Sequence, residues 1–195
     1  EEEIGQLING GYIFYNDTNN GISYVASEDY IGDGQWGCND IAVNGSDGHE
    51  IGDGQQNTLD ILAANYVNSN SAAVIASSYS NGFDDWYLPS KDELNLMYTN
   101  LHDASPSLGG FAYYYYWSST EYNSSSAWLQ NLGNGSLFNP AKSNYYYVRA
   151  VRAISIFGCT DTTACNYDAT ANSDDGSCIL PDGCTDPLAF NYNSS

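Results

Sequence analysis

The sequence predicts an α+β fold with two helices and short antiparallel strands, followed by a small disulfide-rich and Asp-rich tail. Three observations predict it: β-rich segments open and close residues 1–157, two helical patterns lie between them, and the composition shifts abruptly after residue 157. The chain has 195 residues, enough for one main core and a small appendage. We therefore divide it into residues 1–157 and residues 158–195.

The first predicted element is a β-hairpin near the amino terminus. Residues 11–15 and 22–26 are short runs rich in aromatic and β-branched side chains. Residues 16–21, which separate them, are Asn-Asp-Thr-Asn-Asn-Gly, and these residue types favour turns. The pattern predicts two antiparallel strands.

The first helix is predicted behind Asn57 and Thr58, which can cap a helix start. The apolar residues that follow have the helical spacing i, i+3, i+4, i+7 and i+8, namely Leu59, Leu62, Ala63, Tyr66 and Val67. This spacing places them on one face of a helix.

The second helix is predicted to begin at Ser90, because Ser90 and Glu93 have the spacing of a capping box. Its apolar face is formed by Leu94, Met97, Tyr98 and Leu101. The chain then becomes β-rich at residues 113–119, 127–131 and 145–154. The last of these segments is nearly continuously apolar, which is typical of a central strand.

Residues 158–195 differ from the rest in composition, since they contain no Lys, Arg, His or Trp. Residues 158–167 align with residues 183–192 at a spacing of 25 residues, so the segment contains a repeat. The second copy stops at Ser195, before any counterpart of residues 174–178. Repeat units need neighbours to bury their faces, so we expect the natural protein or its assembly to continue beyond this end.

The charge balance excludes several classes of function. Four Lys and Arg stand against 24 Asp and Glu, for a formal net charge of −20. Nucleic-acid binding and adhesion to an anionic membrane both depend on basic side chains, so we expect neither. The sequence contains no apolar run of about 18 residues, so we expect no membrane insertion either.

Four cysteines lie close together in the second region: Cys159, Cys165, Cys178 and Cys184. Zinc sites favour shorter spacings, so this pattern favours structural disulfides, although it leaves their connectivity open. Closing one such loop stabilises a small segment by about 3 kcal/mol in the chain-entropy model. Disulfides indicate an oxidising compartment, so we predict an extracellular or cell-surface protein with Cys38 as a buried thiol.

The same region is rich in oxygen donors that Ca²⁺ prefers: Asp161, Asn166, Asp168, Asn172, Asp174 and Asp175. Their spacing differs from that of an EF-hand. A solvated acidic turn is an equally good interpretation, and both stay open.

Two further patterns bear on chemistry. His49 and His102 are the bases of suitable pKa, and neither lies in a recognisable catalytic motif, so we predict a non-enzymatic protein. Aromatic residues crowd the predicted strands, and the candidates for ligand contact are Tyr115, Trp117, Trp128 and Tyr146. Core packing is the favoured interpretation of these rings, and stacking on sugars or on a partner subunit is the alternative.

Several longer phrases are more specific: GGYIFY at 10–15, WGC at 36–38, IGDGQQNT at 51–58, DWYLPSKDEL at 85–94, YWSSTE at 116–121 and YVRAVRA at 147–153. Together, over about residues 5–155, they resemble the Lcl-type C-terminal domain of collagen-like bacterial adhesins. The helix start at 88–94 and the strand at 148–152 are also similar to parts of C-type-lectin-like and formylglycine-generating-enzyme domains. This resemblance implies a C-type-lectin-like mixed fold.

The region from residue 158 resembles the Cys-rich and Asp-rich tandem repeats of large surface proteins exported by marine and gliding bacteria. Both resemblances imply the cell exterior. Collagen-like adhesins of this kind are associated with sulfated polysaccharides, whereas this chain has only Lys91, Lys142, Arg149 and Arg152 as cations. The sequence therefore does not favour direct binding of sulfated sugars. Formylglycine enzymes need two reactive cysteines, and only Cys38 lies in residues 1–157, so their activity does not carry over.

These observations predict a non-catalytic, extracellular surface or adhesion module that binds a glycan or a protein, with bound Ca²⁺ as its candidate cofactor. The alternative is a structural subunit that self-associates, as a trimer or as a polymer in a fibre or sheath, through its terminal segments. An enzyme related to the formylglycine-generating fold is a third possibility, and it would need a metal or a second cysteine near Cys38.

Overall fold

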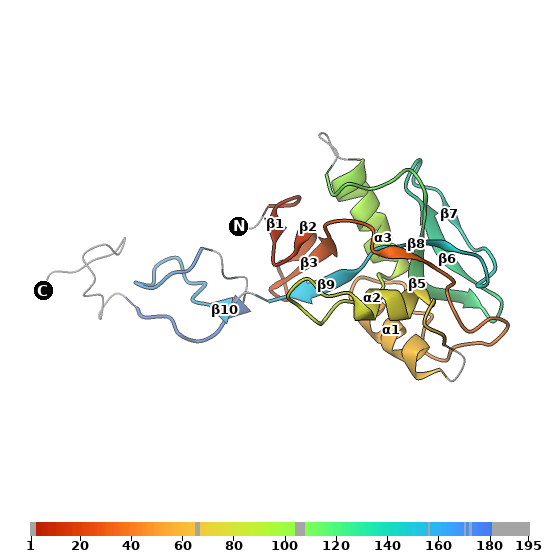
Figure 1. The fold of residues 1–195 in the computed structure, drawn as a ribbon. Coiled ribbons are helices and arrows are strands. Elements are labelled where there is room, and N and C mark those ends of the chain that lie inside the picture. Colours follow the sequence, from red (N-terminus) through yellow and green to blue (C-terminus); the bar gives the residue numbers. More distant parts are fainter. Residues whose placement is uncertain are drawn as a thin grey trace, which may run out of the picture.

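The computed structural model describes residues 3–64, 67–103, 108–155, 157–169, 171 and 173–180. Within these ranges, three α-helices and one π-helix lie against two β-sheets in an α+β arrangement (Figure 1). The first sheet has the strand order β1-β2-β3-β9, and the second has the order β4-β8-β5-β6-β7. None of the helices in the described ranges is long and apolar enough to cross a membrane.

The first sheet contains the predicted hairpin. Its strands are β1 (Leu7–Ile8), β2 (Gly11–Asp17), β3 (Ile22–Ser27) and β9 (Val151–Ile154). β2 and β3 pair antiparallel from Gly11 opposite Ser27 to Asp17 opposite Ile22, with a register shift between Ile13 and Tyr15. The hairpin prediction is therefore confirmed.

The second sheet is built mainly from the second half of the domain. Its strands are β4 (Gly32–Gly34), β5 (Tyr115–Asn123), β6 (Ser126–Asn131), β7 (Leu137–Phe138) and β8 (Tyr146–Val148). β5 and β6 form an antiparallel hairpin, and β8 runs parallel to β5 with Tyr147 opposite Tyr116. The strands predicted at 113–119 and 127–131 correspond to β5 and β6.

The helix prediction is confirmed in part. α3 (Lys91–Met97) begins behind Ser90, whose Oγ accepts a hydrogen bond from Glu93 N at 3.2 Å, while Ser90 N donates to Glu93 Oε2 at 2.7 Å. The predicted capping box is thus present. A π-helix, η1 (Tyr98–His102), continues α3 and extends its predicted apolar face to Leu101.

The first predicted helix begins at the wrong residue. α1 spans Asp53–Ala63, so Asn57 and Thr58 lie inside it and do not cap it. Its start depends on two glycines: Gly52 has the left-handed φ of 96°, and a Cβ on Gly54 would lie 2.2 Å from Glu93 Oε2. Of the predicted apolar face, Leu59 is exposed, Val67 lies beyond the helix, and Tyr66 lies outside the described residues.

The prediction of two helices is also wrong in number, because α2 (Ala72–Ser78) is a third. Only seven residues long and built largely of small side chains, α2 shows too little apolar periodicity to be recognised. Its buried residues Ala72, Ala73 and Ala76 pack into the core beside Trp36.

The segment predicted as one central strand, residues 145–154, divides between the two sheets as β8 and β9. The break lies at Arg149 and Ala150, and β9 is an edge strand of its sheet. Arg149 explains the break, because its guanidinium turns inward to donate to the carbonyl oxygens of Ser27 and Glu28, both at 2.7 Å.

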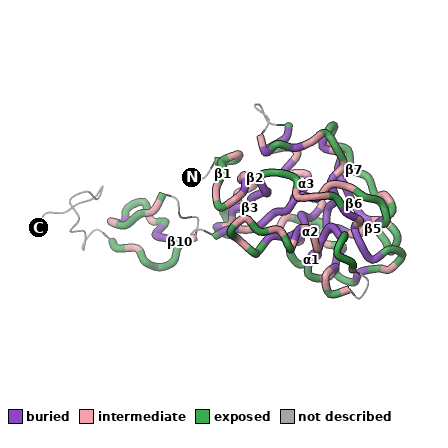
Figure 2. The backbone as a smooth tube through the Cα atoms, viewed as in Figure 1, coloured by how far each residue is buried: buried purple, intermediate pink, exposed green. Residues whose placement is uncertain are grey.

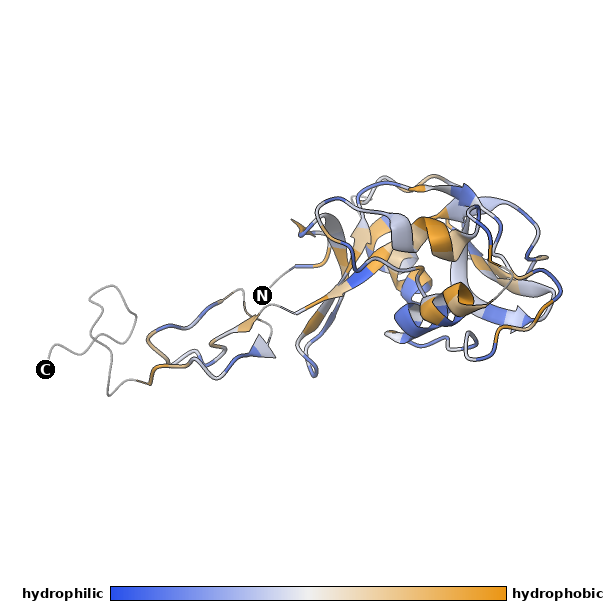
Figure 3. Ribbon diagram, turned by 60° about the horizontal axis from the view of Figure 1, so that its bottom comes forward, coloured by the Kyte–Doolittle hydropathy of each residue, from blue (hydrophilic) through white to orange (hydrophobic). Residues whose placement is uncertain are grey.

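Two buried clusters fill the interior. The first centres on Trp36, Ile61 and Trp117, where α1 and α2 face the second sheet. The second centres on Phe14, Leu94 and Tyr116, where α3 packs against both sheets. Figure 2 shows buried stretches along the helices and strands, and Figure 3 shows hydrophobic stretches along the same elements.

The described residues of the tail, 157–169, 171 and 173–180, contain little regular structure and extend away from the two main sheets (Figure 1). β10 (Phe157–Gly158) pairs in parallel with β11 (Ser173–Asp174), and a disulfide joins Cys159 to Cys178. Cys165 is also disulfide-bonded, whereas Cys38 is a buried free thiol. The predicted disulfide involvement is confirmed for these three cysteines of the tail, and Cys184 lies outside the described residues.

Candidate functional site

The burial and contacts of the four Lys and Arg side chains limit which ligands the surface can bind. Lys142 is fully buried: its Nζ donates to Ile41 O at 2.9 Å, forms an ion pair with Glu121, and lies 4.4 Å from the centre of the Trp36 ring. Glu121 Oε1 also accepts a hydrogen bond from Val43 N at 2.9 Å. This pair therefore holds the loop at residues 41–43 against β5.

The two arginines are equally committed to internal contacts. The buried Arg149 donates to three backbone carbonyls, those of Ser27, Glu28 and Gly109, and burial lowers its pKa to about 10. Arg152 Nη2 donates to Asp85 Oδ2 at 2.9 Å, and its guanidinium carbon lies 3.9 Å from the centre of the Phe83 ring. Neither arginine is positioned to neutralise a ligand anion.

Only two basic side chains remain at the surface, and both meet the same carboxylate. His49 Nδ1 lies 3.1 Å from Asp92 Oδ2, and Lys91 Nζ lies 3.6 Å from Asp92 Oδ1. The other histidine, His102, is buried among the rings of Tyr98, Phe111 and Tyr113, and burial lowers its pKa.

An aromatic corner adjoins this charged group. Lys91 Nζ lies 5.5 Å from the centre of the Trp128 ring, and Trp128 meets Tyr122 edge to face at 5.3 Å and 83°. The Trp128 side chain is partly exposed, and Tyr122 is 54% exposed. We call these five residues, His49, Lys91, Asp92, Tyr122 and Trp128, the Trp128 site.

Hydrogen bonds to the backbone carbonyls of residues 48 and 49 hold the segments of the Trp128 site together. Gly48 O accepts from Thr120 Oγ1 at 2.8 Å and from Asn57 Nδ2 at 2.6 Å, and His49 O accepts from Asp92 N at 3.0 Å. Because β5, α1 and the start of α3 all bind the same short loop, His49 and Asp92 project from a fixed backbone.

Glu93 lies buried behind this loop. Its Oε1 accepts from Gly52 N at 2.9 Å and from Tyr87 OH at 3.3 Å, and its Oε2 accepts from Ser90 N. Burial raises the pKa of Glu93 to about 7, although these hydrogen bonds favour the charged form. The side chain joins the start of α1 to the start of α3.

We expect Glu93 to make the fold less stable as the pH rises. Its pKa is raised from the ordinary value of 4.5 to about 7, so its contribution is complete below pH 4.5 and is lost as the pH rises through about 7. The loss is on the order of 3 kcal/mol of unfolding free energy. Urea unfolding across this range, compared with Glu93→Gln, isolates the effect, and a pH-independent difference between the two chains would contradict it.

A second aromatic surface, partly exposed, lies on β5, β7 and β8 and on the segments that precede β4 and β5. Its rings form a continuous series of contacts, and we name it the tyrosine surface: Tyr30, Tyr114, Tyr115, Phe138, Tyr146 and Tyr147. Tyr30, which is 50% exposed, stacks on Tyr147 at 4.8 Å, and Tyr114 lies 4.5 Å from Tyr147. Tyr115 then contacts both Tyr146 and Phe138.

The four ligand-contact residues predicted from sequence therefore separate. Tyr115 and Tyr146 lie together on the tyrosine surface, whereas Trp128 lies in the Trp128 site. Trp117 is fully buried and donates its Nε1 hydrogen to Gly34 O at 2.9 Å, so its prediction as a ligand contact is wrong. It points into the core because the residues of β5 alternate between the two buried clusters.

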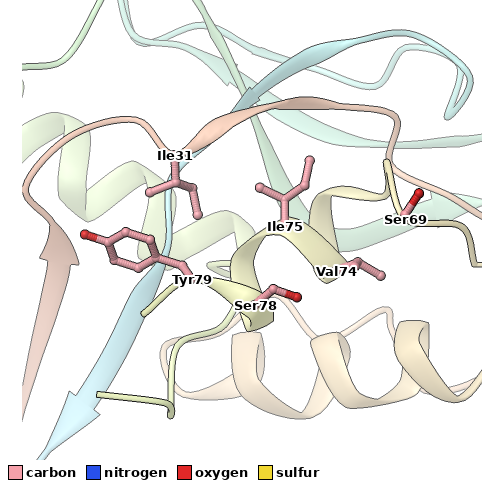
Figure 4. A pocket seen from close by; sticks show the side chains of 6 residues that line it. All are labelled: Ile31, Ser69, Val74, Ile75, Ser78 and Tyr79. Atoms are coloured by element: carbon pink, nitrogen blue, oxygen red, sulfur yellow. The ribbon is translucent and has the colours of Figure 1, made fainter. Parts of the chain in front are cut away.

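A pocket of about 310 Å³ opens beside α2 (Figure 4). Figure 4 shows the side chains of Ile31, Ile75 and Tyr79 around it, and Ser69, Val74 and Ser78 complete its lining. It contains no charged group, and nothing in its chemistry indicates a particular ligand.

The predicted calcium donors have local partners in the tail. Asp161 Oδ1 accepts from Thr163 N, Asp174 Oδ1 from Gly176 N, and Asp175 Oδ1 from Ser177 N, as in short polar turns. Asn166 bridges Ser177 O and Ile179 N, and Asn172 lies outside the described residues. Within the described part of the chain no three His, Cys, Asp or Glu side chains form a metal-binding group. Calcium binding, including the part of Asp168, stays a prediction.

Sequence reasoning identified one residue of the Trp128 site as a ligand contact, Trp128 itself. The sequence singles out His49 only as a candidate base and Lys91 only as one of four cations. Asp92 stands out only as part of the phrase DWYLPSKDEL, and Tyr122 belongs to none of the sequence patterns. They converge because the hairpin β5–β6, the loop at 48–50 and the start of α3 pack together, which is a tertiary arrangement.

The part of the chain that contains the Trp128 site matches a known protein family. Residues 35–152 match the family model described as the Lcl C-terminal domain. A comparison with curated proteins finds no match. All five residues of the Trp128 site lie within the matched segment.

Proposed function

The chain belongs to the Lcl C-terminal domain family, and from this premise we propose that it is a non-catalytic extracellular recognition module for a partner without net negative charge. One observation carries the proposal. All three fully or nearly buried cations, Lys142, Arg149 and Arg152, serve internal contacts, while two groups of aromatic rings stay exposed. Such a surface offers rings, hydroxyls and carboxylates, which suit a neutral glycan or a protein.

The absence of catalysis is part of this proposal. His49 lies against the Asp92 carboxylate and His102 packs against aromatic rings, and these contacts give no support to a Ser–His or Cys–His pair. Burial raises the pKa of Cys38, an effect opposite to the activation of a thiol nucleophile.

The extracellular location is likewise proposed, and the tail supports it. A disulfide between Cys159 and Cys178 suits an oxidising environment. We further propose that the main domain is C-type-lectin-like and that the tail is a surface-protein repeat. The antiparallel pairing of β3 with β9, from opposite ends of the domain, supports the first of these assignments.

We expect neutral polysaccharides, and not sulfated ones, to bind the chain. Electrophoresis of the full chain in native gels cast with dextran, mannan, xylan or β-glucan should show retardation by at least one of them. Gels cast with heparin or dextran sulfate should show none, because no unpaired cation is available to hold sulfate. Salt-sensitive retention by heparin would contradict the proposal.

The second candidate function is a self-associating structural subunit of a fibre or sheath. It is favoured by β7, the last strand of its sheet, whose residues Leu137 and Phe138 are both exposed. An exposed apolar edge strand can pair with a second copy. The C-terminal repeat expected to dock lies outside the described residues. Size-exclusion chromatography with light scattering on the same preparation distinguishes polymers from the discrete species that the first candidate requires.

A further inference from the structure

We propose that the Trp128 site is a saccharide subsite that binds the ring of an uncharged sugar. This inference rests on the proposed function and assigns a location and a ligand class to it. The site combines the two kinds of group that bind neutral sugars: aromatic faces for the C–H surface of the ring, and charged groups that hydrogen-bond hydroxyls.

The main support for this proposal is that the two basic side chains that are not buried lie together. The whole chain has four Lys and Arg and two His, and the structure describes all six. Four of them are buried, and the remaining two, Lys91 and His49, both lie against Asp92 beside Trp128. A surface salt bridge contributes little to stability, so folding alone gives little reason for this concentration.

Lys91, Asp92 and His49 retain capacity to form hydrogen bonds with a ligand. The separation of 3.6 Å between Lys91 Nζ and Asp92 Oδ1 is too long for a hydrogen bond, and the Asp92 side chain is 41% exposed. A hydroxyl placed between these atoms can accept from the ammonium and donate to the carboxylate at the same time. His49, with its side chain 55% exposed, borders the other carboxylate oxygen and offers a ring nitrogen to a second hydroxyl.

The aromatic corner supplies the remaining contact. Trp128 and Tyr122 meet almost at right angles, so a flat sugar ring can pack on one ring and touch the other with its edge. The fixed loop at 48–50 lowers the entropy that binding must overcome, because its carbonyl oxygens already accept hydrogen bonds from β5, α1 and α3.

Local charge restricts the ligand to the uncharged class. Lys91 already shares its charge with Asp92, and Asp47 and Glu50 are exposed on the adjoining loop. A sulfate or a uronic carboxylate would meet these acidic groups with no uncommitted cation to compensate.

Trp128 also provides a reporter for the test. Trp36, Trp86 and Trp117 are buried, so Trp128 is the tryptophan that a small quencher reaches. Acrylamide quenching of the full chain is measured with cello-, manno- and galacto-oligosaccharides, and with heparin and oligogalacturonate fragments as anionic probes. We expect at least one neutral series to protect Trp128 and the anionic probes to leave it accessible.

Variants locate the binding. Asp92→Asn should weaken protection by about tenfold or more, because a hydrogen bond to a charged group is lost. Tyr122→Ala should weaken it by about fivefold through loss of the aromatic corner. Asp47→Asn, on the adjoining loop, and Tyr145→Ala, a comparably exposed tyrosine outside both aromatic surfaces, are the matched controls and should leave it unchanged.

The outcomes separate this inference from the proposed function. Retardation in neutral gels that Tyr30→Ala abolishes and Tyr122→Ala preserves would overturn the Trp128 site while leaving the recognition function intact. Protection by the anionic fragments would overturn the uncharged ligand class. Absence of both gel retardation and protection would overturn the inference together with glycan recognition, and would leave a protein as the partner of the proposed function.

Discussion

Replacing Lys142 by methionine is expected to lower the unfolding free energy by about 3–5 kcal/mol. Methionine fills a similar volume, but it leaves the Glu121 carboxylate without its cation at a site where both side chains are nearly or fully buried. Ile41 O loses its donor as well. Urea unfolding followed by tryptophan fluorescence measures the loss.

Two control variants test whether the loss of stability arises from the Lys142–Glu121 ion pair. Lys91→Met removes the partly exposed cation of the Trp128 site and should cost at most about 1 kcal/mol. The double variant Lys142→Met with Glu121→Gln removes both charges and should recover part of the loss, since the carboxylate is no longer buried without a partner. If Lys142→Met and Lys91→Met cost the same, the pair does not anchor the loop at residues 41–43.

Cys38 reports on the same loop independently. It is buried, and its thiol is the free cysteine of the described chain. Its reaction with a thiol reagent should accelerate in Lys142→Met, because Ile41 and Val43 are held in place through the Lys142–Glu121 pair. An unchanged reaction rate would place the stability loss elsewhere in the domain.

The elements that the sequence predicted correctly are those specified by adjacent residues. The capping box at Ser90 depends on residues three positions apart, and the hairpin at 11–27 depends on one turn. The start of α1 depends instead on Gly54 fitting against Glu93, which lies 39 residues away in the chain and is invisible to local periodicity. Tertiary contact overrides propensity at that position.

A buried charge explains the error at residues 145–154. A local pattern treats residues 145–154 as one apolar run, yet Arg149 must satisfy carbonyl oxygens at Ser27, Glu28 and Gly109, so the strand breaks there. The site was accessible to sequence reasoning only through Trp128. Its five members come from three separate parts of the chain, the loop at 48–50, the start of α3 and the hairpin β5–β6, and no spacing in the sequence predicts that they meet.

Replacing Trp117 by alanine is expected to cost about 3–5 kcal/mol of unfolding free energy, because it leaves a cavity in the core and removes the donor to Gly34 O. The change should be seen as a lower urea midpoint. Trp117→Phe keeps most of the packing and should cost about 1–3 kcal/mol, mainly through the unsatisfied carbonyl.

Trp128→Ala is the matched comparison, and it separates a core tryptophan from a binding one. Its ring is partly exposed, so its removal should cost less stability than Trp117→Ala while abolishing retardation by neutral polysaccharide. Trp117→Phe should bind as the unmodified chain does, since Trp117 has no exposed surface to offer a ligand. Loss of binding in a folded Trp117→Phe variant would restore Trp117 as a ligand contact, whereas equal stability losses in Trp117→Ala and Trp128→Ala would show that both rings serve the core.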